Sequence, residues 1–350
     1  MIGFYSKTAL KRREYRWFFC TILGFALFFL QALRSKYVGT DSIATVAIYE
    51  NIGSRRVFVN SDFFPIYGYL IRILYALFQG EQAILILNAA IIITAVMLLI
   101  YEFSCDQFLS VYLYIVLYFY HTSFNIARQY SAIGFCLIAY VLFEKKNKLA
   151  WLFAVCALGT HVTSFIFFAV YFAYKFIPKL HNIGFQLCIC LIGAVAVQFL
   201  FTPLFSLVAR ILPHYALYTT GSMNLMEYQG QGRKLILTLV YLVFLLLAYF
   251  AIKSAEKKGK EIPEELRQEY FFVCIGVMLG LAGSKLQLIA RLESYLTIFA
   301  IVLIPKVVRA FRGRTRTIVY LGCMAVMFVP FFIQLSGNTS GVMPYMLCWE

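Results

Sequence analysis

The chain has 350 residues, of which 62% are hydrophobic and only 13% are charged. This composition excludes an ordinary soluble globular protein and predicts an all-α polytopic membrane protein. Apolar runs extend along the whole chain, so we expect a single integral membrane domain, residues 1–350. A net charge of +15 would suggest a nucleic-acid partner in a soluble protein. Here we expect none, because most of the positive charge is a topology signal.

The chain begins with a basic segment and an apolar run. Residues 1–16 are rich in Lys and Arg, and the first predicted span follows at 17–33. We expect the basic segment to stay in the cytoplasm, which places the N-terminus inside. Residues 34–62 are polar and contain Gly39-Thr40-Asp41, so they predict an outer loop.

The next apolar run, residues 63–79, carries a narrow polar stripe. The stripe consists of Gly68, Arg72, Tyr75 and Gln79, which recur at helical spacing. Pro65 suits the first turn of such a helix. We therefore expect an amphipathic helix on the outer face, within a periplasmic loop at 34–82, and not a crossing.

With that helix outside the membrane, the remaining apolar runs predict eleven crossings and an outer C-terminus. The expected spans are 17–33, 83–101, 109–124, 126–143, 149–160, 163–176, 184–202, 235–252, 271–283, 293–308 and 317–335. The cytoplasmic segments then hold 20 of the 31 Lys and Arg, as the positive-inside bias prefers. A second long outer loop is predicted at 203–234.

Residues 149–176 are too few for two ordinary crossings, because each takes about 20 residues. We expect two short helices that meet at Gly159-Thr160-His161, a break tolerated where protein or a water-filled cavity surrounds it. The tip of the preceding hairpin carries Arg128, and the basic turn 144–148 separates the two tips. Arg128 and His161 are therefore expected on the same side, and ionisable residues within a membrane indicate function.

Eleven Lys and Arg remain on the predicted outer side, where topology disfavours them. A lipid-linked phosphate or diphosphate would explain them, because the arginine fork matches phosphate oxygens. Ion pairs with acidic side chains, or contacts with lipid headgroups, are the alternative. Arg128 and Arg291 are the strongest candidates for an anionic ligand, since each lies against a helix core.

The other candidate site residues suit sugar chemistry. His161 can accept a proton from a sugar hydroxyl, or it is a hydrogen-bonded packing residue. Asp41, on the outer loop, is the second candidate base. Tyr215 and Tyr218 can stack on sugar rings, or they belong to an aromatic belt. The sequence shows no metal or cofactor motif, so we expect neither.

Several short motifs are similar to those of one family. The run Phe124-Asn125-Ile126-Ala127-Arg128-Gln129, a Lys-rich turn and His161 together resemble the EpsG family, bacterial polysaccharide polymerases akin to Wzy-type O-antigen polymerases. Further similarities are Gly39-Thr40-Asp41, Arg291 with Tyr295, and the terminal Pro344-Tyr345. The chain departs from the pattern at Val162, where the family usually has Ser.

The resemblance implies a GT-C-like glycosyltransferase of the bacterial inner membrane. It would polymerise undecaprenyl-diphosphate-linked oligosaccharide repeat units, both donor and acceptor, at the periplasmic face. In this hypothesis Arg128, Gln129 and Arg291 bind the donor diphosphate, and His161 or Asp41 is the base. Its partners would be membrane lipids, a chain-length regulator and a flippase. A lipid-linked oligosaccharide flippase and a membrane O-acyltransferase are the alternatives.

Overall fold

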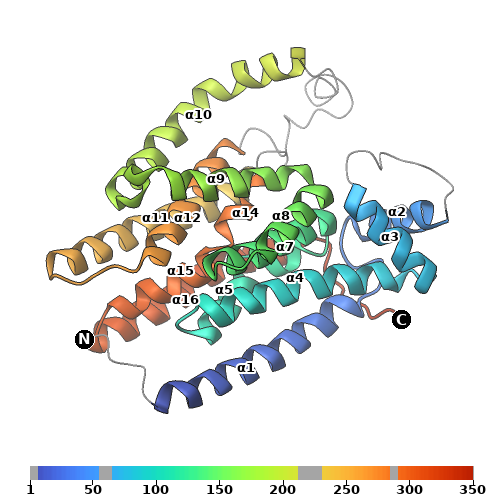
Figure 1. Ribbon diagram of the computed structural model, residues 1–350, viewed down its shortest axis with the longest axis horizontal. Coiled ribbons are helices and arrows are strands. Elements are labelled where there is room, and N and C mark those ends of the chain that lie inside the picture. The colour runs from blue at the N-terminus through green and yellow to red at the C-terminus, as the bar shows by residue number, and fades with distance from the viewer. Residues whose placement is uncertain (1–6, 55–64, 212–230, 284–290, 350) are drawn as a thin grey trace. The chain divides into compact units, whose positions relative to one another are not determined.

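The computed structural model describes residues 7–54, 65–211, 231–283 and 291–349. Within these residues the regular structure is helical, apart from one isolated bridge between Arg34 and Leu347 (Figure 1). This confirms the predicted all-α class. The chain divides into two compact units. The first unit is Met1–Phe165 with Gln334–Glu350, and the second unit is Ile166–Ile333.

The first unit is built from helices packed side by side. They are α1 (Lys7–Ala32), α4 (Gln82–Phe103), α7 (Ala127–Glu144) and α8 (Leu149–Thr160). Helix α4 packs against α1 and α7, and α7 also packs against α8. A Cβ at Gly134 of α7 would lie 2.9 Å from Ile91 Cγ2 of α4. The two helices therefore approach closely at a small residue, as membrane helices often do.

Contacts at both ends of α1 and α4 define the connectivity of the first unit. At one end Arg16 donates to the carbonyl of Ser104 at 3.0 Å, and Lys145 pairs with Glu102. At the other end Lys36 pairs with Glu81 at 2.7 Å, and Gln82 donates to the carbonyls of Ala32 and Arg34. Residues 33–81 therefore leave and return at this second end, which we call the motif end.

A helix that the sequence analysis treated as loop lies at the motif end. Helix α2 (Ser42–Gly53) buries Ser42, Val46, Tyr49 and Ile52. These positions recur at helical spacing, so one face of α2 is covered while the rest of the segment is polar or exposed. The predicted outer loop 34–82 thus contains a helix that the local pattern does not mark, because apolar side chains such as Ile43 and Ile48 also lie on its exposed face.

Helix α3 (Pro65–Leu77) packs against α2 and α8. It rises about 1.5 Å per residue over 13 residues, which is too short for a hydrocarbon core about 30 Å thick. Gly68 is buried and Tyr75 packs on Tyr49, with ring centroids 5.4 Å apart. Gly68 and Tyr75 of the stripe thus face protein, whereas Gln79 lies beyond α3 and is exposed, as are Tyr69 and Ile73. An outward apolar face is typical of a helix lying against lipid.

Two predicted helices are interrupted. The predicted span 109–124 consists of α5 (Gln107–Val116) and α6 (Phe119–Thr122), with the left-handed residue Tyr118 (φ 69°) between them. Nothing in the sequence marks this break, because Tyr is neither Gly nor Pro. The predicted break after Gly159 is confirmed. Helix α8 ends at Thr160, and a 3₁₀ turn at Val162–Ser164 precedes α9 (Phe165–Phe176).

The second unit is arranged around α12 (Glu264–Ala282). Around it lie α10 (Ile183–Ile211), α11 (Gln231–Lys257), α14 (Ser294–Thr297) and α15 (Ala300–Ala310), and the unit also includes most of α9 and of α16 (Gly313–Ser336). In its core the ring of Phe167 stacks on that of Phe299, and the ring of Phe272 meets both edge to face. The predicted helix 293–308 is divided into α14 and α15, and α10 and α11 extend into the predicted loop 203–234.

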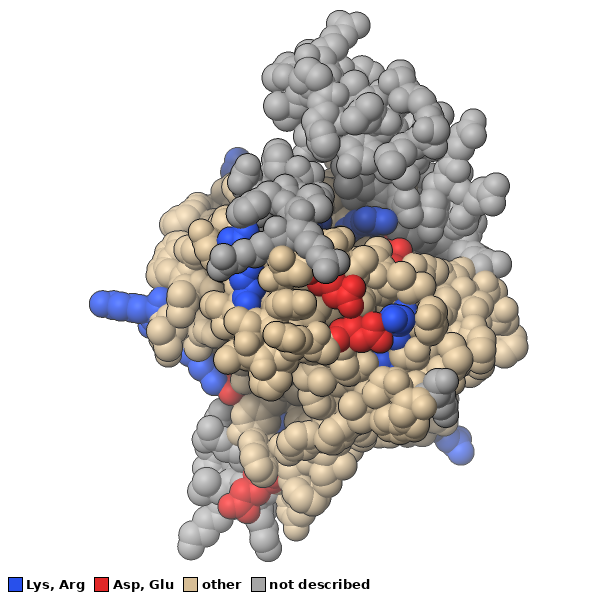
Figure 2. Space-filling model, turned by 90° about the vertical axis from the view of Figure 1, so that its right-hand side faces the viewer, with Lys and Arg blue, Asp and Glu red and all other residues tan. Residues whose placement is uncertain are grey.

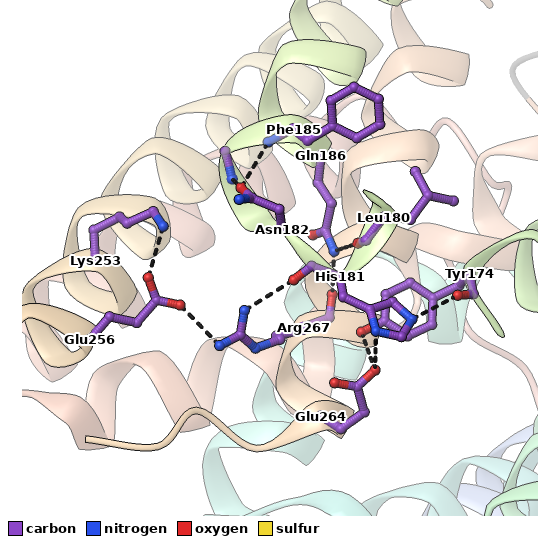
Figure 3. Close-up of polar contacts among 11 residues, drawn as sticks. Tyr174, Leu180, His181, Asn182, Phe185, Gln186, Lys253, Glu256, Glu264 and Arg267 are labelled. Carbon is purple, nitrogen blue, oxygen red and sulfur yellow. Dashed lines mark hydrogen bonds and ion pairs between the residues drawn. The ribbon is translucent and has the colours of Figure 1, made fainter. Parts of the chain in front are cut away.

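A polar network holds the 3₁₀ turn Pro178–His181 against α12 (Figure 3). Arg267 donates to the carbonyl of His181 and pairs with Glu256, both at 3.0 Å. Glu264 accepts from the hydroxyl of Tyr174 at 2.7 Å and lies 3.6 Å from His181 Nδ1. Each exposed pair contributes little to stability, and together the contacts join the ends of α9 and α11 to the beginning of α12.

Four of the described helices are long and apolar enough to cross a membrane on their own. They are Glu14–Ala32, Gln82–Phe103, Ile236–Lys257 and Gly313–Ser336. Shorter apolar helices include α3, α5, α8 and α9. These findings support a multi-pass membrane protein, whereas the count of eleven crossings and the GT-C-like fold remain predictions.

Candidate functional site

The α7–α8 hairpin brings Arg128 and His161 to the same end of the first unit. Arg128 is the second residue of α7, and His161 directly follows the last residue of α8. The two helices pack together and are joined by the short turn 145–148, so the start of α7 lies beside the end of α8. Gln129 is buried beside Arg128, which is itself half-buried.

The helix break gives His161 a defined setting. Its backbone is extended (φ −154°, ψ 116°), and its Nδ1 lies 2.6 Å from the hydroxyl oxygen of Thr163. This contact orients the imidazole ring. The hydroxyls of Thr160 and Ser164 are buried, and neither has a hydrogen-bond partner within the described residues. The break therefore gathers hydroxyl groups around a partly exposed histidine.

Arg128 lies near a buried polar cluster that joins three helices. Asn88 Oδ1 of α4 accepts from the hydroxyl of Tyr67 of α3 at 3.1 Å and from that of Ser131 of α7 at 2.7 Å. Arg128 lies close enough to the Tyr67 hydroxyl for its positive charge to interact with that group. Ile66 of α3 packs against Gly159. Helix α3 is thus held next to both the start of α7 and the end of α8.

Asp41 occupies the N-cap position of α2, but its carboxylate makes no cap hydrogen bond. It accepts instead from the Thr40 hydroxyl at 3.3 Å and is partly exposed. The hydroxyl of Ser42 donates to the carbonyls of Val38 at 2.8 Å and Phe124 at 3.2 Å. The turn that carries Asp41 is therefore attached to the segment that leads into α7.

The C-terminal tail also binds at the motif end. Gly39 N–H donates to the carbonyl of Gly341 at 2.8 Å, and Asn125 Nδ2 donates to that of Ser340 at 3.0 Å. Ser35 N–H donates to the carbonyl of Met346 at 2.9 Å. The structure thus brings together Gly39-Thr40-Asp41, Phe124-Asn125 and the tail, which sequence reasoning had treated as separate motifs.

Two of the predicted outer cations serve contacts within the protein. Arg34 is 1% exposed, donates to the carbonyls of Gln31 and Phe124, and stacks on the Phe124 ring at 4.6 Å. Burial lowers its pKa to about 10, so it stays charged at neutral pH. Lys36 pairs with Glu81. For these two residues the ion-pair and packing alternative holds.

Three of the predicted site residues are not among the described residues of the first unit. Arg291 is partly buried and belongs to the second unit. Its joint role with Arg128 therefore remains a prediction. Tyr215 and Tyr218 lie outside the described residues. Within the described ranges, no three His, Cys, Asp or Glu side chains gather in a way that could hold a metal ion.

Comparison with known proteins gives one match. No curated protein and no solved structure matches the chain. The model of the EpsG family, however, matches residues 17–347, which is nearly the whole chain. The match covers Gly39-Thr40-Asp41, Phe124-Asn125, Arg128 and His161. The chain therefore belongs to the EpsG family, a family of Wzy-like polysaccharide polymerases.

Proposed function

We propose that this protein polymerises undecaprenyl-diphosphate-linked oligosaccharide repeat units at the periplasmic face of the bacterial inner membrane. The growing glycan would leave its lipid diphosphate and join a hydroxyl of the next lipid-linked unit. Family membership supports a polysaccharide polymerase in general. The observation that carries the finer proposal is the placement of Arg128 and His161 at one end of the α7–α8 hairpin.

Arg128 is the proposed ligand of the donor diphosphate, with Gln129 beside it and Arg291 as a second cation. As the bond between the anomeric carbon and the diphosphate oxygen breaks, both electrons leave with the diphosphate. A preorganised cation then stabilises the developing negative charge, which is usually the largest catalytic term. Lysine carries the same charge but lacks the planar fork that binds two phosphate oxygens.

His161 is the proposed base for the acceptor hydroxyl. The hydroxyl oxygen attacks the anomeric carbon and forms the new glycosidic bond, and its proton passes to the imidazole. If Nδ1–H donates to the Thr163 oxygen, Nε2 holds the lone pair that accepts this proton. Asp41 is the alternative base, since its carboxylate is partly exposed and does not cap α2.

The proposal is tested in a strain that lacks the gene and carries variants at normal protein level. Arg128→Ala and His161→Ala should abolish long polymer, and Arg128→Lys should reduce it strongly, because general acid–base and oxyanion terms are each worth about 10²-fold or more. The matched control is Arg309→Ala, an exposed arginine at the end of α15, which should leave polymer length unchanged. Full-length polymer from all three site variants would refute the assignment.

The same strain separates the polymerase from the two alternatives. Loss of a polymerase leaves single repeat units on the outer side of the membrane, whereas loss of a flippase leaves them inside. Loss of an O-acyltransferase leaves polymer of normal length without its acyl groups. Only the first outcome agrees with the proposal.

A further inference from the structure

The C-terminal tail is tied to the rest of the first unit by a set of backbone contacts. Cys348 N–H donates to the carbonyl of Leu33 at 2.8 Å, and Arg34 and Leu347 form a bridge. The hydroxyl of Tyr345 donates to the carbonyl of Leu30. These contacts fix the tail beside the end of α1, which leads directly into the turn that carries Asp41.

The tail also has its own internal structure. Asn338 Nδ2 donates to the carbonyl of Met343 at 2.6 Å, and Asn338 Oδ1 accepts from Met343 N–H at 3.0 Å. Asn338 and Gly341 both have left-handed backbones, with φ of 44° and 60°. The side chain of Asn338 therefore closes a turn that presents the carbonyls of Ser340 and Gly341.

These two carbonyls bind two different segments. Gly341 accepts from Gly39 N–H, two residues before Asp41, and Ser340 accepts from Asn125 Nδ2, three residues before Arg128. One short stretch of tail thus holds both segments that carry candidate site residues. The tail adds these two bonds to the direct bonds that Arg34 and Ser42 make to the carbonyl of Phe124.

Asn125 is the side chain at which all three segments meet. It is 9% exposed, and its Oδ1 has no hydrogen-bond partner among the residues that the structure describes. A Cβ at Gly39 would lie 2.7 Å from this oxygen and 2.7 Å from the hydroxyl oxygen of Ser42. The Gly39 turn therefore packs directly on the Asn125 amide, and a larger residue would force these side chains to shift.

We propose that Asn125, together with residues 337–349, positions the Asp41 turn relative to Arg128 and so sets the geometry of the reaction. This inference rests on the proposed polymerase function. Asn125 is a positioning residue, because it acts through Gly39 and the tail. A misplacement of about 1 Å can cost up to about a hundredfold in rate, so the contact matters for turnover more than for substrate binding.

The test uses the full-length protein in proteoliposomes, supplied with lipid-linked repeat unit extracted from a strain without the gene. Asn125→Ala should lower kcat about tenfold or more with KM nearly unchanged. Asn125→Asp should do the same, because a carboxylate cannot donate to the Ser340 carbonyl. The matched control is Asn51→Ala, an exposed asparagine on α2, which should behave as wild type.

A double-mutant cycle tests whether Asn125 and the tail act together. Asn338→Gly removes the clamp on Met343, and glycine tolerates the left-handed backbone at this position. The double variant Asn125→Ala with Asn338→Gly should be no slower than the slower single variant, whereas independent sites would multiply their effects.

The outcomes separate this inference from the function on which it rests. If the wild-type protein forms no polymer from the extracted unit, the proposed function fails. If the wild-type protein forms polymer and Asn125→Ala has the same kcat, only the positioning role is refuted. The same holds if the losses of rate in Asn125→Ala and Asn338→Gly multiply in the double variant.

Discussion

At the scale of single residues, the motif end depends on a glycine that has no substitute. Gly39 has a φ of 106°, a backbone conformation that L-residues rarely adopt, and it lies against Asn125 and Ser42. Both conditions follow from the close approach of the Asp41 turn to Phe124-Asn125. The Gly-Thr-Asp motif is therefore a structural requirement as well as a candidate site.

Gly39→Ala should destabilise the protein by about 1–3 kcal/mol, because strain at a positive φ adds to overlap with Asn125 Oδ1. The unfolding temperature of the purified protein in detergent measures this loss.

Two other glycines serve as controls that separate the cost of backbone strain from the cost of side-chain overlap. Gly259 has a φ of 67° with no atom within 4 Å of a built Cβ, so Gly259→Ala carries backbone strain alone. Gly80 has open space and no positive φ, so Gly80→Ala should be close to neutral. An unfolding temperature for Gly39→Ala equal to that of Gly80→Ala would contradict the packing described here.

At the scale of helices, the sequence predicted those elements that have a strong local signal. The break between α8 and α9 follows from a run too short for two crossings and from Gly159, and the structure has it there. The break at Tyr118 has no local signal, since tyrosine rarely adopts the left-handed backbone that it has there. Helix α2 was not predicted because apolar side chains lie on its exposed face as well as on its buried face, so no amphipathic stripe marks it.

The candidate site was predictable in part for the same reason. Hairpin connectivity alone placed Arg128 and His161 at one end. The convergence of Asp41, Asn125 and the tail could not be predicted, because these segments are more than 80 residues apart in sequence and meet through backbone carbonyls that any residue supplies.

Packing of α3 on α8 gives a prediction at this scale. A Cβ at Gly159 would overlap the side chain of Ile66, and not only its flexible tip. Gly159→Ala should therefore lower the unfolding temperature, by the equivalent of about 1–3 kcal/mol for an overpacked contact. Shortening the partner in Gly159→Ala with Ile66→Ala should recover part of the loss. A double variant that is less stable than Gly159→Ala would show that overlap with Ile66 is not the cause of the loss.

At the scale of the whole molecule, the surface agrees with a chain embedded in lipid. On the face shown in Figure 2, charged side chains form small patches, and most of the coloured surface is uncharged. Large apolar side chains such as Phe25, Ile192 and Phe332 are exposed. A soluble protein rarely exposes so much apolar surface.

The charges at the two ends of the first unit predict the side of the membrane on which each end lies. The end with Arg16 and the turn 145–148 is basic, so it should face the cytoplasm, and the motif end with Thr40 should face outward. The test uses a variant without its nine native cysteines. In cells whose outer membrane is permeabilised and whose inner membrane is intact, Thr40→Cys should react with a membrane-impermeant maleimide. Lys146→Cys should react only after the inner membrane is permeabilised. Both positions are exposed, so access to the reagent depends on sidedness. If Lys146→Cys alone reacts before permeabilisation, the motif end faces the cytoplasm. If both variants react equally before permeabilisation, the two ends are not on opposite sides of the membrane. Either result would contradict a site that uses lipid-linked units on the outer side.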